Sequence, residues 1–212
     1  LTVDFSRFIF ELFAMPPQPL SSFNTKVGIV PDAAKLSERP ILAQLIAIVI
    51  ATWADVDVAL GEMLNYFLDG DHRHTTAVYL ALRSGQPAAI RAGAESCLST
   101  DELGLFEIIF SLAGRAKSAR DKIAHGLWGI HPKVPENLVW VNPRSKLTHL
   151  AGLTTRRRKG PKEIPTMGPY SPEGMLVYSQ KDLEEIVEQC KRAGYLVRWF
   201  NRMVERTNDA KQ

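Results

Sequence analysis

The stretch Ser118-Ala119-Arg120-Asp121-Lys122-Ile123-Ala124-His125-Gly126-Leu127-Trp128 decides how this 212-residue chain is interpreted. The residues before it have the apolar spacing of one face of an amphipathic helix: Leu103, Phe106, Phe110 and Ala113. At about 100° per residue, the same face continues through Lys117, Asp121, Ala124 and Trp128. The face expected to be buried therefore turns charged for two turns. Because buried charges are costly unless they are paired, we expect this face to line a cleft or a polar interface.

Three ionisable residues of this stretch are the candidates for chemistry. Arg120 and His125 lie about 140° apart around the helix axis, with Asp121 between them. Asp121 and His125 stand at i, i+4, which allows them to pair. A buried Arg-Asp-His network that merely ties the helix to its neighbours is the structural alternative.

The run Arg120-Asp121-Lys122-Ile123-Ala124-His125, followed by Gly126 near a helix end, resembles the motif of the HEPN superfamily. In that motif an arginine precedes an acidic or amide residue, three further residues and a histidine. The resemblance implies a helical bundle. It also implies a metal-independent endoribonuclease of a toxin, antiphage-defence or RNA-processing system, or a relative that has lost activity and only binds.

The resemblance assigns a role to each motif residue. A base removes the proton of the ribose 2′-OH, that oxygen attacks the adjacent phosphorus, and an acid protonates the leaving 5′-oxygen. His125 would transfer protons, Arg120 would bind and stabilise the phosphate, and Asp121 would orient the imidazole. Lys117 would add a phosphate contact. No metal and no cofactor is expected.

HEPN ribonucleases usually place two copies of the motif across a homodimer interface, and the resemblance implies the same here. Arg120 of one copy and His125 of the other would then converge on one phosphate. A nucleotidyltransferase-type antitoxin is a further possible partner. Two other readings stay open: a catalytically silent module that binds RNA, nucleotides or proteins, and a plain structural dimer.

The charge of the chain is uneven. Its net charge is +3, yet the segment 143–163 carries seven cations and one acid, or +6, so the remainder sums to −3. The run Arg156, Arg157, Arg158 and Lys159 is expected either to contact RNA phosphates or to be a solvated basic turn.

Several features favour a cytoplasmic protein. Cys97 and Cys190 are expected to be buried, reduced thiols. No N-terminal stretch has the form of a signal peptide. The apolar run 41–54 is too short to span a bilayer and is followed by Asp55 and Asp57, so we expect a central core helix and no membrane partner.

The fold class expected is mainly all-α, an up-and-down helical bundle of the HEPN type with a small antiparallel β-hairpin or meander before the last helix. Residues 1–39 would form an N-terminal arm with a short helix at 1–13 and a proline-rich connector. Residues 40–212 would form the helical domain, with the β insertion at about 137–178. The expected helices are 40–68, 71–83, 87–98, 99–125 and 179–205, and the expected strands are 137–142, 146–153 and 174–178.

Overall fold

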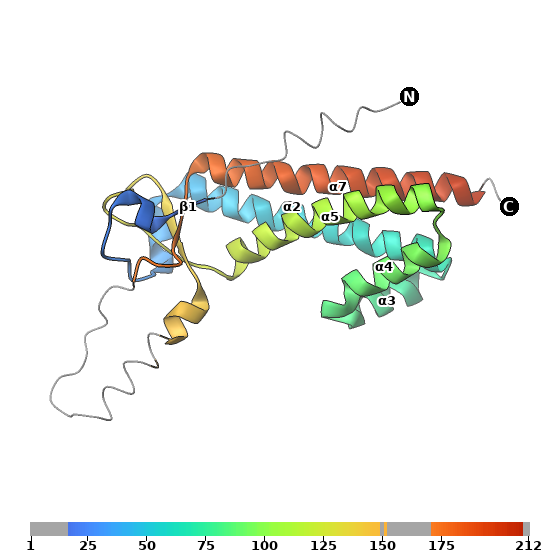
Figure 1. Cartoon of the computed structure of the whole chain (residues 1–212), viewed down its shortest axis with the longest axis horizontal. Helices are drawn as coiled ribbons and strands as arrows, with labels where there is room; N and C mark the ends of the chain where they lie inside the picture. Colours follow the sequence, from blue (N-terminus) through green and yellow to red (C-terminus); the bar gives the residue numbers. More distant parts are fainter. Residues whose placement is uncertain (1–16, 149–150, 152–170, 210–212) are drawn as a thin grey trace. The chain divides into compact units, whose positions relative to one another are not determined.

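The computed structural model describes residues 17–148, 151 and 171–209 (Figure 1). Most of these residues are helical, and four short strands form one antiparallel sheet. The chain divides into two compact units: the first holds residues 1–48 and 121–186, the second residues 49–120 and 187–212. The boundaries fall inside three long helices, α2 (Pro40–Leu68), α5 (Thr100–His125) and α7 (Gln180–Asp209).

The first unit is built around the sheet, whose strand order is β1-β4-β3-β2. Its strands are β1 (Gln18–Pro19), β2 (Leu127–Gly129), β3 (Leu138–Val141) and β4 (Leu176–Tyr178). In register, Trp128 of β2 pairs with Trp140 of β3, and Trp140 pairs with Leu176 of β4. The strands expected at 137–142 and 174–178 are confirmed as β3 and β4.

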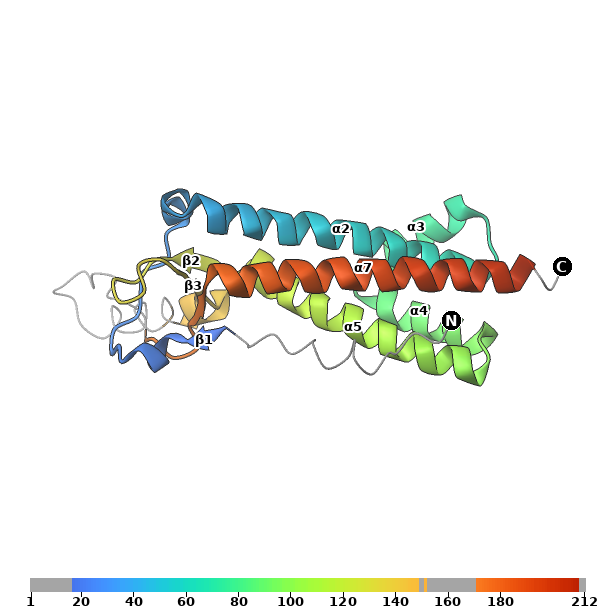
Figure 2. The same ribbon diagram turned by 90° about the horizontal axis from the view of Figure 1, so that it is seen from above.

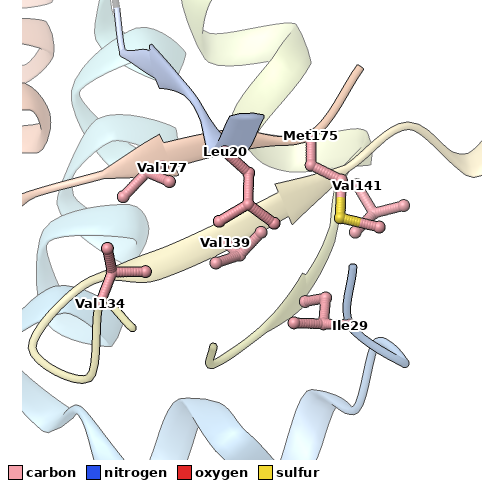
Figure 3. Packing of buried hydrophobic residues seen from close by; sticks show 7 residues of the cluster. All are labelled: Leu20, Ile29, Val134, Val139, Val141, Met175 and Val177. Carbon is pink, nitrogen blue, oxygen red and sulfur yellow. The ribbon is translucent and has the colours of Figure 1, made fainter. Parts of the chain in front are cut away.

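Alternation along the strands gives the sheet two different faces. One face and the segments crossing it form an apolar cluster of seven residues: Leu20, Ile29, Val134, Val139, Val141, Met175 and Val177 (Figure 3). The other face carries the aromatic residues Trp128, Trp140 and Tyr178, of which Trp128 and Tyr178 pack edge to face with centroids 5.3 Å apart. β3 is buried on both faces for this reason.

The segment before α2 is an ordered connector that wraps the sheet. It forms two 3-10 helices, η1 (Leu20–Phe23) and η2 (Ala33–Glu38). The buried His131 holds the segment by its Nε2 atom, 3.1 Å from the Val27 carbonyl oxygen, while His131 Nδ1 accepts the Lys133 N–H at 3.1 Å. Because Nδ1 accepts and the Val27 carbonyl can only accept, the proton of the neutral ring lies on Nε2.

The second unit is helical. It contains α3 (His72–Leu82), α4 (Gln86–Cys97), a 3-10 turn η3 (Arg83–Gly85) between them, and most of α2, α5 and α7 (Figure 2). Phe106 of α5 is fully buried and contacts Phe67 of α2 and Phe200 of α7, with ring centroids 5.8 and 6.1 Å apart. The unit is therefore a bundle in which α2, α5 and α7 share one apolar core. The expected helix boundaries are confirmed to within a few residues.

Two sequence-based expectations need correction, and a third concerns residues outside the described ranges. Residues 143–148 are helical, not part of a strand at 146–153, because Asn142 caps them through its Oδ1, 2.9 Å from the Arg144 nitrogen, and Pro143 suits a first helical turn. Cys97 is exposed at the end of α4, whereas Cys190 is buried as expected. The helix expected at 1–13 lies outside the described residues.

A further correction concerns α2, which is not enclosed in its first half. Leu42 and Val49 are buried there, but Ile41 is 59% exposed, so the described residues cover only one side of this apolar helix. With 29 residues, α2 is long and apolar enough to cross a membrane by length and composition alone. Only 28% of its most apolar window is buried inside the protein. α2 therefore has more apolar side chains than the described residues bury.

Candidate functional site

The motif stretch lies at the end of α5, which begins with a capping box. The Ser99 backbone nitrogen and hydroxyl donate to Glu102 Oε2 at 2.8 and 2.7 Å. The buried face of α5 is rotated from the expected one. It runs through Phe106, Ile109, Ala113, Ala116 and Ile123, so Lys117 is exposed and Arg120, not Asp121, continues the core stripe.

Arg120 is the last residue of the second unit and is half-buried on the core-facing side of α5. Its charge acts on Cys190 of α7, a fully buried thiol in the same unit. Burial raises the pKa of Cys190 to about 11, and the positive charge of Arg120 opposes that rise. The guanidinium of Arg120 therefore lies within electrostatic range of the buried face of α7.

Asp121 and His125 belong to the first unit. Asp121 is half-buried and, like Lys117 and Arg120, takes part in at least one polar or electrostatic interaction. His125 is the final residue of α5 and is exposed. Its imidazole is thus accessible to a ligand in solution, whereas Arg120 lies about 140° away around the same helix. The pairing of Asp121 with His125 stays a prediction.

The end of α5 that carries His125 is held by Trp140. The indole Nε1–H donates to the carbonyl oxygen of Lys122 at 2.7 Å, which satisfies one of the last four carbonyls of the helix. Gly126 makes this possible, because a Cβ at that position would lie 1.8 Å from Trp140 Nε1. The glycine that follows the motif is thus required by the contact between strand β3 and the helix end.

Sequence reasoning missed this role of Trp140. Trp140 is buried within β3, and Gly126 directly follows the last residue of α5. The signal was the combination of a glycine directly after the helix and a tryptophan inside the next strand, because a buried indole N–H usually finds a hydrogen-bond acceptor.

Other ionisable residues are exposed, lie at a helix start or fall outside the described residues. Arg156, Arg157, Arg158 and Lys159 lie outside the described residues. Asp55 and Glu62 of α2 are exposed. Asp71 caps α3 by accepting the backbone N–H of Arg73 at 2.7 Å, so His72 and His74 mark a helix start. Across the described ranges, no group of three His, Cys, Asp or Glu residues is arranged to hold a metal.

Comparison of this chain with protein-family models, with curated proteins and with solved structures finds no match.

Proposed function

We propose that the chain is a metal-independent endoribonuclease of the HEPN type, acting in a toxin or antiphage-defence system in the cytoplasm. The observation that carries the proposal is His125: an exposed imidazole on the last residue of a helix whose end is held by Trp140. An imidazole is the side chain best suited to move protons near neutral pH. A fixed helix end gives that ring a defined position.

Arg120 supplies the second part of the proposed chemistry. Its guanidinium stays protonated and can donate two parallel hydrogen bonds to phosphate oxygens, where charge gathers during attack by the 2′-OH. Asp121, between the two residues, would orient His125 or balance Arg120. Exposed Lys117 would add a phosphate contact, as would the basic run from Arg156 to Lys159.

One helix points Arg120 and His125 in directions about 140° apart, so we propose that two copies of the chain supply the two groups to each phosphodiester. In a dimer with two-fold symmetry, Arg120 of one copy and His125 of the other form one site, and the symmetry generates a second. A nucleotidyltransferase-type antitoxin would act on this assembly.

A second candidate function is favoured by the half-buried position of Arg120 beside Cys190. A guanidinium committed to the interior of the bundle would stabilise the fold and leave His125 without a partner for the phosphate. The chain would then be a catalytically silent module that binds RNA, nucleotides or another protein.

Cleavage of RNA in EDTA tests the proposal. Wild-type protein is expected to release fragments with 2′,3′-cyclic phosphate and 5′-hydroxyl ends, the products of 2′-OH attack. His125→Ala is expected to lower the rate by about 100-fold or more, and Arg120→Ala by a similar factor. His74→Ala, which removes another exposed histidine, is the matched control and should keep full activity.

The alternatives give different results in the same experiment. Equal cleavage by wild type and both variants means a contaminating nuclease and contradicts the proposal. RNA binding without cleavage, lost in Arg120→Ala, supports the silent module. Loss of folding in Arg120→Ala, seen as a lower unfolding temperature, supports a purely structural role for the guanidinium.

A further inference from the structure

The outer face of α7 carries a row of cations that the motif does not use. Arg198, Arg202 and Arg206 follow one another at i, i+4 spacing, and all three are exposed. Tyr195, 63% exposed, lies on the same face just before them. We call these four residues the arginine row. It lies entirely within the second unit.

The cations of the row are not balanced by neighbouring acids. Three other exposed cations have an acidic partner: Arg91 pairs with Glu107, Lys181 with Glu185 and Lys191 with Glu188. Among the described residues, the three arginines of the row form no such ion pair. Like charges at i, i+4 on a helix repel each other, so the bare helix is destabilised by this arrangement.

The nearest acid on the helix, Glu205, is directed elsewhere. It lies beside Tyr66 of α2, whose pKa is raised by burial first and by the Glu205 charge second. The helix dipole favours a cation only in the last turn, which accounts for Arg206 but not for Arg198 or Arg202. The row therefore presents an uncompensated positive surface.

Arg198, the first arginine of the row, lies close to the contact between α7 and α2. Gly194 allows α7 to approach α2, since a Cβ there would lie 3.2 Å from Val56 Cγ2. The terminal nitrogens of Arg198 lie 3.3 and 3.5 Å from the same position. The Arg198 head thus lies back along the helix over Gly194, the residue before Tyr195.

We propose that the arginine row binds the backbone of single-stranded nucleic acid, with Tyr195 stacking on a base. Positive grooves or stripes interleaved with aromatic rings are how proteins bind such strands without reading their sequence. From Arg198 to Arg206 the helix rises about 12 Å, a length occupied by about three nucleotides of a stacked strand.

The same observations argue against an anionic membrane as the partner. A helix that lies on a membrane must expose an apolar face to the lipid. The apolar face of α7, with Val197, Phe200 and Val204, is buried in the bundle. The arginine row exposes three cations and one aromatic ring, which fits a polyanion that offers bases.

Binding of fluorescent oligothymidylate, measured by anisotropy at several salt concentrations, tests the proposal. Deoxyribose has no 2′-OH, so this probe reports binding whether or not the chain cleaves RNA. The triple variant Arg198→Gln, Arg202→Gln, Arg206→Gln is expected to reduce the slope of log affinity against log salt by about 2. Tyr195→Ala is expected to weaken binding at every salt concentration by about fivefold or more, with the slope unchanged.

The matched control is the triple variant Lys26→Gln, Arg73→Gln, Lys181→Gln, which changes the net charge equally at other exposed positions. It is expected to retain the wild-type slope. Equal losses in both triple variants, or no binding by the wild type at low salt, would overturn the proposal. So would a row variant that loses binding to phosphatidylserine vesicles but keeps its affinity for oligothymidylate.

Discussion

At the level of single residues, Gly126 has almost no space for a side chain. A Cβ there would overlap the Trp140 indole, at 1.8 Å from Nε1 and 2.1 Å from Cδ1, and would displace its hydrogen bond to Lys122. We predict that Gly126→Ala lowers the free energy of unfolding by about 2–4 kcal/mol, from overpacking and the lost hydrogen bond. Urea unfolding of wild type and Gly126→Ala measures this difference in the free energy of unfolding.

Gly104→Ala is the control for this substitution. Gly104 lies on α5, where no other group comes within 4 Å of the place that a Cβ would take, so alanine should stabilise the helix by up to about 1 kcal/mol. If both substitutions changed stability alike, the contact between Trp140 and the helix end would not be what requires glycine at position 126.

Cys190 gives the fold a dependence on alkaline pH. Because burial raises its pKa from about 9 to about 11, the folded chain holds the thiol proton more tightly than the unfolded chain. This stabilisation is complete below pH 9 and is lost as the pH rises towards 11. Across that pH range, we predict that the free energy of unfolding falls less in Cys190→Ala than in wild type, by on the order of 2–3 kcal/mol.

Urea unfolding on either side of that range, at about pH 8 and about pH 11, checks the prediction, with Cys97→Ala as the variant at the exposed thiol. Burial also raises the pKa of Tyr178, to about 12, but that tyrosine is present in all three proteins. An identical pH dependence in Cys190→Ala and wild type would show that Cys190 is not buried in solution.

At the level of the elements, the two capping boxes differ in geometry. At the start of α7, the Asp182 nitrogen lies 3.2 Å from Ser179 Oγ, whereas at α5 the Glu102 nitrogen lies 3.5 Å from Ser99 Oγ. We predict that Ser179→Ala costs about 1 kcal/mol and Ser99→Ala less. Thermal unfolding compares the two, and a larger loss in Ser99→Ala would contradict the prediction.

The long helices were predictable because several local signals agree at each of them. α7 has a serine cap, an apolar stripe that is buried over six turns and a polar outer face, and α2 begins at Pro40 as expected. The short strands β1 and β2 were missed because two or three residues carry no period of their own. They form only because β4 and β3 supply partners from distant segments.

In α5, sequence periodicity did not predict which side of the helix is buried. Phe106 and Ala113 fit two adjacent apolar stripes, and only packing selects the one that continues through Ala116 and Ile123. That choice rotates Arg120 towards the core and leaves Lys117 exposed. The residues of the motif could be named from the sequence, but the side of the helix on which each lies required the structure.

At the level of the whole molecule, the proposed activity depends on two copies acting together. We propose that Arg120 of one copy and His125 of the other serve the same phosphodiester. Arg120→Ala and His125→Ala homodimers would each be inactive. In a mixed dimer, one of the two sites would contain both substitutions and the other would contain neither.

Subunit complementation is therefore the most direct measurement. The two inactive variants are mixed in equal amounts, allowed to exchange subunits, and assayed for RNA cleavage in EDTA. Random exchange makes half of the dimers mixed, each with one intact site, so we predict recovery of about a quarter of the wild-type activity. A mixture that exchanges subunits yet stays inactive, beside an active wild type, would contradict a site shared between copies.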